Sequence, residues 1–172
     1  MGTQTKRNYL KLVNRLRKAL NHNAQIFTLD HIKFATNKYP FQKVILGDHN
    51  PRRVLISAGI HGDEPAGVES VCAFLESGRY KPHLDEWEIT ILPCINPYGF
   101  ENDTRENHDN QDLNRLFKDQ LPPLEVQLAK STFKPSYFDI TIELHEDSDS
   151  HGYYLFQKSN QPNGLEIGFK II

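Results

Sequence analysis

The fold is decided by the stretch RVLISAGIHGDEPAG at residues 53–67. Its first eight residues form a nearly continuous apolar run, which is typical of a strand buried on both faces of a sheet. Asp63 or Glu64 is suited to cap a helix, and Pro65 is suited to the first helical turn. The stretch therefore predicts a buried strand, a sharp corner, and a helix that ends near Ser77.

Further predicted elements extend this unit in both directions. Strands are expected at residues 25–29, 31–35, 41–46, 87–95, 138–144 and 153–156, and the last three of these are expected to be buried. Helices are expected at residues 6–20 and 124–133. The order strand, helix, strand, long polar connection, helix, strand is typical of a layered α/β sheet. Ligands of such sheets bind at the carboxyl ends of the strands, so polar residues that directly follow strands are the candidate site residues.

Composition narrows the class of protein. The 172 residues predict one domain, and 20 Lys and Arg against 22 Asp and Glu give a net charge of −2. This balance argues against a dedicated nucleic-acid binder and against a polybasic membrane anchor. Cys72 and Cys94 are too few for a disulfide framework, so we expect two reduced, buried thiols. The first residues lack the apolar stretch of a secretory signal, and we expect a cytoplasmic enzyme or binding protein.

Three of the predicted strands are followed by residues that can bind a metal or a carboxylate. His61 and Glu64 follow the first, and an imidazole nitrogen and a carboxylate oxygen both suit zinc. His145 directly follows the strand at 138–144, where a polar residue needs a reason. Two histidines and one glutamate form a known catalytic zinc pattern with an open fourth position. The alternative is a capped helix corner and a hydrogen-bonded histidine at the core edge, and spacing alone does not separate the two interpretations.

The polar loop at residues 100–123 adds further candidates. Arg105 and Arg115 carry planar guanidinium groups that can bind a carboxylate or a developing oxyanion, and Asn114 adds an amide donor. Solvated surface arginines are the alternative. Loops of this length are unusual unless they are functional, which favours the first interpretation.

Taken in order, these pieces resemble the zinc carboxypeptidase superfamily, which includes the succinylglutamate desuccinylase and aspartoacylase branch. The matching pieces are HGDE at 61–64, NPYG at 96–99, Arg105, DLNR at 112–115 and LH at 144–145. The stretch ELHEDSD at 143–149, followed by GYYL at 152–155, is more similar to a bacterial-type peptidase branch. The resemblance spans roughly residues 50–157. It implies a three-layer α/β/α fold with a mixed, mostly parallel sheet. A single domain would occupy residues 1–172, and its catalytic core would lie at about 40–172.

The resemblance also implies roles for individual residues. One zinc ion would be bound by His61, Glu64 and His145, with Asp112 as the carboxylate that orients His61. Arg105 would stabilise the oxyanion, and Asn114 and Arg115 would hold the free carboxylate of the substrate. Zinc would polarise the scissile carbonyl and lower the pKa of its bound water.

One part of the family pattern is missing. The general base of the family is a Glu on a late strand, beyond the third zinc ligand, and no Glu before Ile172 stands in that context. Glu166 lies in the last segment without a mark of the base, and Glu143 and Glu146 beside His145 are weaker substitutes. We therefore expect a fold that is incomplete at the C-terminus, and a chain that is weakly active or inactive.

The function expected from these observations is zinc-dependent, metallocarboxypeptidase-like hydrolysis of an amide bond adjacent to a free carboxylate. An N-acyl amino acid deacylase of the desuccinylase and aspartoacylase type is the first alternative. It needs the same carboxylate clamp, that is, the groups of Asn114 and Arg115 that would hold the free carboxylate of the substrate. A non-catalytic zinc-binding or carboxylate-binding domain is an alternative from another class. The expected partner is a small molecule or peptide with a free carboxylate, without nucleic acid or membrane, and the sequence does not predict an oligomeric state.

Overall fold

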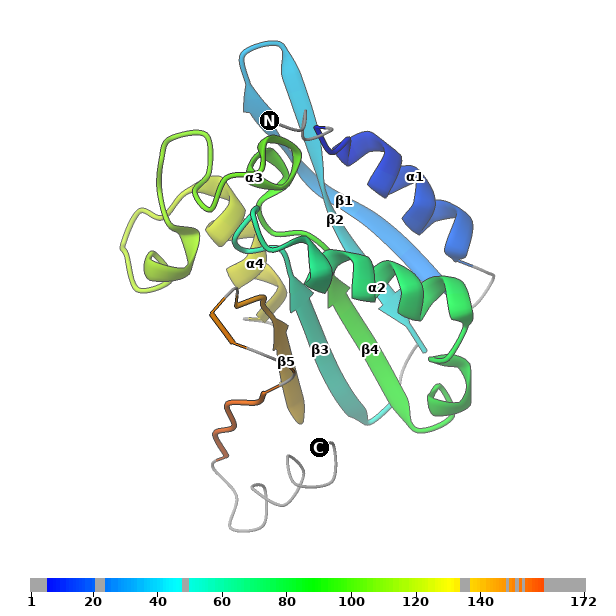
Figure 1. Cartoon of the computed structure of the whole chain (residues 1–172). Helices are drawn as coiled ribbons and strands as arrows, with labels where there is room; N and C mark the ends of the chain where they lie inside the picture. Colours follow the sequence, from blue (N-terminus) through cyan, green and yellow to red (C-terminus); the bar gives the residue numbers. More distant parts are fainter. Residues whose placement is uncertain are drawn as a thin grey trace.

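The computed structural model describes residues 6–20, 24–47, 50–133, 137–147, 149–150, 152 and 154–159. Its centre is a five-stranded sheet with the strand order β1-β2-β4-β3-β5 (Figure 1). The strands are β1 (Ala24–Phe34), β2 (Asn37–Leu46), β3 (Arg52–Ala58), β4 (Trp87–Leu92) and β5 (Ile140–Leu144). The strand β3 pairs in parallel with β4 and β5, whereas the β1–β2 and β2–β4 pairings are antiparallel. The predicted mixed α/β sheet is confirmed.

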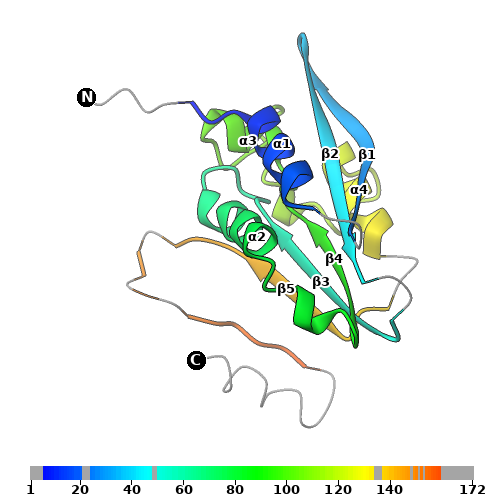
Figure 2. The same ribbon diagram turned by 90° about the vertical axis from the view of Figure 1, so that its right-hand side faces the viewer.

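Helices cover both faces of this sheet. The helices are α1 (Tyr9–Ala19), α2 (Pro65–Ser77), α3 (Pro97–Asn102) and α4 (Leu124–Phe133), with short 3₁₀ turns at Lys81–His83 and Leu113–Arg115. Figure 2 shows α1 and α2 on one face and α4 on the other, which gives the expected three layers. Among the described residues, no helix is both long enough and apolar enough to cross a membrane.

The two cysteines belong to the buried core, as expected. Cys72 lies on α2 and Cys94 follows β4, and both are free thiols. Burial raises the pKa of the Cys72 thiol to about 11, so it is protonated at neutral pH. Burial also raises the pKa of the Cys94 thiol. Reactive cysteines depend on a lowered pKa, and neither thiol therefore has the environment of a nucleophile.

Two predicted strand boundaries at the start of the sheet were wrong. The runs at 25–29 and 31–35 are parts of one strand, β1, because a bulge between Thr28 and Asp30 absorbs the break in the alternating pattern. The long connection after β4 is also less irregular than its composition indicates. Asn96 caps the six-residue helix α3 by accepting a hydrogen bond of 2.9 Å from the Gly99 amide.

The last predicted strands differ more from the structure. The strand β5 lies at an edge of the described sheet, and its residues Thr141, Ile142 and Glu143 are exposed rather than buried. An apolar run does not distinguish a central strand from an edge strand. Residues 154–156 of the last predicted strand are not in a strand, because they pair with no neighbour in the described sheet. Tyr153 and Glu166 lie outside the described residues.

The ends of β3 and β4 are tied together where both strands stop earlier than predicted. Gly59 adopts a φ of 62°, which turns the chain out of β3 after Ala58. The amides of Ile95 and Asn96 then donate to the carbonyl oxygens of Ala58 and Gly59 at 3.0 and 2.8 Å. These bonds fix the start of the corner that carries His61.

The corner is also packed directly against α3. A Cβ atom at Gly62 would lie 1.9 Å from the carbonyl carbon of Gly99 and 2.3 Å from the amide nitrogen of Phe100. Only a residue without a side chain permits this approach of two backbones. Gly62 therefore allows the residues around it to rest on α3.

Replacing Gly62 by alanine is expected to lower the free energy of unfolding by at least about 2 kcal/mol, since overpacking against backbone atoms cannot be relieved by a rotamer change. Urea unfolding measures the effect. Ser70→Ala, at an exposed position of α2, serves as the control and should change stability by less than about 0.5 kcal/mol. A Gly62→Ala protein as stable as the control would show that α3 moves away freely.

Candidate metal centre

The site begins at the corner after β3. His61 is 3% exposed, and its Nδ1 lies 2.6 Å from Oε1 of Glu64. The Glu64 amide donates to the His61 carbonyl at 3.3 Å, and this turn brings both side chains to the same side of the corner. The two residues predicted as ligands from a three-residue spacing are therefore in direct contact.

Glu64 does not cap α2, although its position made this a reasonable expectation. It occupies the N-cap position without a side-chain bond to the helix, and its Oε2 instead lies 2.7 Å from Nδ1 of His145. The cap is supplied by Glu146, whose Oε2 accepts a hydrogen bond of 2.7 Å from the Ala66 amide. The backbone amide of Glu146 in turn donates to Oε2 of Glu64 at 3.2 Å. The end of β5 is thus attached to the beginning of α2.

The three converging side chains form a set of donors that can hold a metal ion. His61, Glu64 and His145 each offer one ligand atom, and these atoms all lie within 4.8 Å of one another. The two histidines direct Nδ1 toward opposite oxygens of the same carboxylate. Zinc takes nitrogen and oxygen ligands at about 2.0–2.2 Å, so small movements of these side chains are enough for coordination. The donor set fits a metal ion of the zinc type.

Asp112 contacts His61 on the side of the ring that faces away from Glu64. Its Oδ1 is 3.3 Å from Nε2 of His61, and its Oδ2 accepts hydrogen bonds of 3.2 and 3.1 Å from Nε and Nη2 of Arg105. Partial burial raises the pKa of Asp112, but the Arg105 guanidinium and the nearby His61 outweigh this effect, and the pKa is lowered overall. Asp112 is therefore an ionised acceptor at neutral pH.

Arg105 contacts two parts of the site at once. While Nε and Nη2 bind Asp112, Nη1 lies 3.5 Å from Oε1 of Glu64. Its side chain is 38% exposed, so the guanidinium also faces solvent beside the candidate ligands. This is a suitable place for a cation that interacts with a substrate oxygen.

Asn114 lines a cavity beside the candidate ligands, whereas Arg115 is mostly exposed to solvent. Asn114 lines a cavity of about 170 Å³ that also contacts His145 and Glu143, with mainly apolar residues for its other walls. The side chain of Arg115 is 76% exposed, and its Nε is 3.9 Å from Oδ2 of Asp112. The structure thus brings Asn114 to the cavity, whereas the Arg115 side chain is exposed to solvent beside Asp112.

Sequence reasoning missed two residues that organise the site. Glu146 entered only as a weak substitute for the base, and its contact with α2 joins residues far apart in the chain. Arg7 lies in the predicted helix at 6–20 and had no predicted role in the site, yet it donates a hydrogen bond to the carbonyl of Gly62. Neither contact has a local sequence signal, because both depend on how distant segments meet.

The fold and the site together describe an α/β protein with a His-Glu-His group at the carboxyl edge of its parallel strands. Residues 50–169 match the family of the succinylglutamate desuccinylase/aspartoacylase catalytic domain. The chain belongs to this family, and the resemblance found in its motifs is confirmed.

Individual relatives are similar in sequence or in fold. Mouse Carboxypeptidase M is 37% identical over 111 residues, which cover 51% of this chain and 25% of that protein. A protein from Shewanella denitrificans assigned as a carboxypeptidase A has 22% identity and a TM-score of 0.69, over 81% of this chain and 40% of the other. A metallo-carboxypeptidase from Pseudomonas aeruginosa in complex with (2-guanidinoethylmercapto)succinic acid has 18% identity and a TM-score of 0.65, over 80% and 38%. The chain thus spans well under half the length of these relatives, and the two structures establish the fold alone.

Proposed function

We propose that this chain carries the metal site of a zinc-dependent hydrolase that cleaves an amide bond adjacent to a free carboxylate. One observation carries the proposal, namely the convergence of His61, Glu64 and His145 beside the Arg105–Asp112 pair. The succinic acid derivative in complex with the Pseudomonas metallo-carboxypeptidase carries free carboxylates, which supports a substrate that also carries a free carboxylate. Metallocarboxypeptidase-like activity is the version that we favour.

In this proposal, some residues of the site bind the metal ion and others orient those ligands. When bound, zinc would polarise the scissile carbonyl and lower the pKa of its water. Asp112 lies 3.3 Å from Nε2 of His61, and as an acceptor there it would hold the proton on Nε2, so that Nδ1 could serve as the ligand atom. The Glu146 amide performs a related task for Glu64, because it donates to one oxygen of that carboxylate.

Arg105 is proposed to stabilise the negative charge that develops on the carbonyl oxygen. Its two bonds to Asp112 hold the guanidinium plane in place before the reaction starts. The remaining nitrogen, Nη1, is close to Glu64 and therefore close to the candidate metal position. A donor fixed in advance costs no reorganisation when charge develops, which is the basis of oxyanion stabilisation.

Asn114 and Arg115 are proposed to hold the free carboxylate of the substrate. In a form of the enzyme with measurable turnover, Arg115→Ala should raise KM about tenfold for substrates with a free carboxylate, since a charge-assisted hydrogen bond contributes about 1.5–3 kcal/mol and exposure weakens it. Steady-state kinetics with amidated and free substrates measure the effect. Arg52→Ala is the matched control, because Arg52 is also exposed and pairs with Glu86. An equal loss on the amidated substrates would exclude the clamp role.

A deacylase is the second candidate, and the family match favours it directly. Both activities would use the same metal ligands and the same carboxylate clamp. They differ in the acyl group on the other side of the scissile amide bond, so substrates that differ in this group distinguish them. Zinc-supplemented turnover of short peptides and of N-acylated amino acids tests both on the same preparation. Faster cleavage of acylated amino acids would replace the carboxypeptidase proposal. Zinc binding without turnover of either substrate is the result expected of a binding domain and equally of an enzyme chain that lacks the general base.

A further inference from the structure

Arg7 contacts several residues that lie more than 50 positions away in the sequence. Its Nη1 donates to two backbone carbonyls, those of Gly62 and Phe100, each at 3.0 Å. Its Nη2 forms an ion pair with Asp103, and its guanidinium carbon lies 5.4 Å from the centre of the Phe100 ring. The side chain is only 24% exposed.

Each of these partners belongs to a segment that leads into the candidate site. Gly62 stands between His61 and Glu64, so the carbonyl that Arg7 binds is part of the corner carrying two proposed ligands. Asp103 ends α3 in a left-handed conformation two residues before Arg105. Phe100 belongs to α3, against which the Gly62 backbone rests. One guanidinium therefore connects the ligand corner, α3 and the start of the Arg105 loop.

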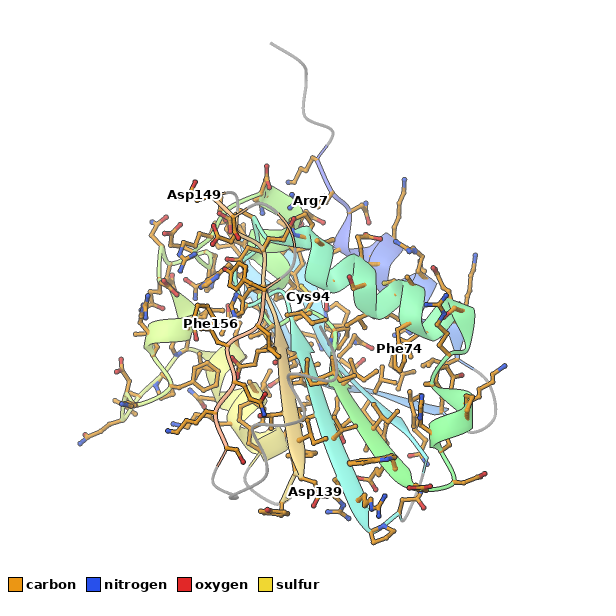
Figure 3. The ribbon with its side chains drawn as sticks, turned by 60° about the horizontal axis from the view of Figure 1, so that its bottom comes forward. Arg7, Phe74, Cys94, Asp139, Asp149 and Phe156 are labelled. Carbon is orange, nitrogen blue, oxygen red and sulfur yellow. The ribbon has the colours of Figure 1, made fainter. Side chains whose placement is uncertain are left out.

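The charge of Arg7 strengthens these contacts. Hydrogen bonds from a cation to a carbonyl are stronger than neutral ones, and partial burial reduces the competition from water. Figure 3 shows Arg7 near the beginning of α2, at the end of the sheet opposite Asp139. Arg7 lies outside residues 50–169, the part of the chain that matches the family.

We propose that Arg7 is a positioning residue that fixes the His61–Glu64 corner for metal binding from outside the matched catalytic region. The proposal rests on the proposed metal site and adds a residue to it. Arg7 does not touch the candidate ligand side chains; it acts through the Gly62 carbonyl. Without Arg7, the corner would still carry His61 and Glu64. It would lose the hydrogen bond to the Gly62 carbonyl, through which Arg7 links the corner to α3.

The experiment compares Arg7→Ala, Arg7→Lys and the control Arg15→Ala. Arg15 also projects from the N-terminal region and pairs with acidic residues, Glu69 and Glu76, but these lie on the outer side of α2. Two quantities are measured: zinc affinity, and hydrogen exchange of the Glu64 amide in the metal-free protein. Thermal unfolding of each variant verifies that it is folded.

For Arg7→Ala we expect zinc affinity to fall about tenfold, at the lower end of the range for residues that support metal ligands. The Glu64 amide should exchange faster. Arg7→Lys keeps the charge without the planar fork and should recover part of both losses, while Arg15→Ala should stay within about twofold of the wild type in affinity.

Wild-type affinity and exchange in Arg7→Ala would overturn the proposal, as would an equal loss in Arg15→Ala, because that result indicates general destabilisation. Failure of the wild type to bind zinc would instead refute the proposed metal site. In that case the exchange of the Glu64 amide still decides whether Arg7 fixes the corner.

Discussion

Replacing His145 by alanine is expected to weaken zinc binding by at least about a hundredfold. Residues that only support metal ligands typically account for 10–100-fold in affinity, so the loss of a ligand should exceed that range. His145 is exposed, and its imidazole contacts Glu64 at the surface of the site rather than filling the core. The variant should therefore fold normally, which makes the affinity change interpretable. Competition with a chromogenic chelator at neutral pH measures it.

His83→Ala is the matched control for this experiment. His83 is also an exposed histidine, and it lies in the 3₁₀ turn before β4, away from the candidate ligands. Its replacement should leave zinc affinity unchanged. Equal zinc affinities of the His145→Ala and His83→Ala proteins would exclude His145 as a ligand.

Zinc should also stabilise the wild type against unfolding by about 2.7 kcal/mol at a zinc concentration of a hundred times the Kd, and a chelator should remove this effect.

In a form of the enzyme with measurable turnover, Arg105→Ala is expected to lower kcat about 10²–10³-fold, the usual loss when one oxyanion donor is removed. Arg105 also supports Asp112, so a second measurement is needed to separate the two tasks. If the guanidinium acts on the substrate, zinc affinity should change only a few-fold while kcat falls. Single-turnover kinetics and zinc titration of the same variant provide both values.

The Asp112→Asn variant tests the other half of the Arg105–Asp112 pair. This change removes the ionised acceptor behind His61 while Arg105 remains, and it should lower zinc affinity about 10–100-fold. Arg105 and Asp112 are therefore predicted to have opposite profiles, one in kcat and the other in zinc affinity. A large loss of affinity with unchanged kcat in Arg105→Ala would show that Arg105 only supports Asp112.

The strand and helix at residues 53–77 could be predicted because their signals are local. An apolar run forms β3, and Pro65 begins α2 as its position predicts. The exposure of β5 could not be predicted in the same way, because a strand's place in the sheet depends on its neighbours. Local patterns therefore located the elements but not the edges of the sheet.

The candidate site shows the same division. His61 and Glu64 could be related by their spacing, and His145 by its position after a strand. The cap of α2 could not, since the local acid Glu64 faces the histidines and the distant Glu146 binds the helix. The candidate ligands carry a chemical signature in the sequence, whereas the residues that hold them in place are recognised only from contacts.

Diffraction at the zinc absorption edge, from crystals of the chain grown with zinc, tests the central claim most directly. We predict an anomalous peak about 2.0–2.2 Å from Nδ1 of His61, from a carboxylate oxygen of Glu64 and from Nδ1 of His145. A peak at another position, or the absence of zinc at these three side chains in crystals that contain it elsewhere, would contradict the account.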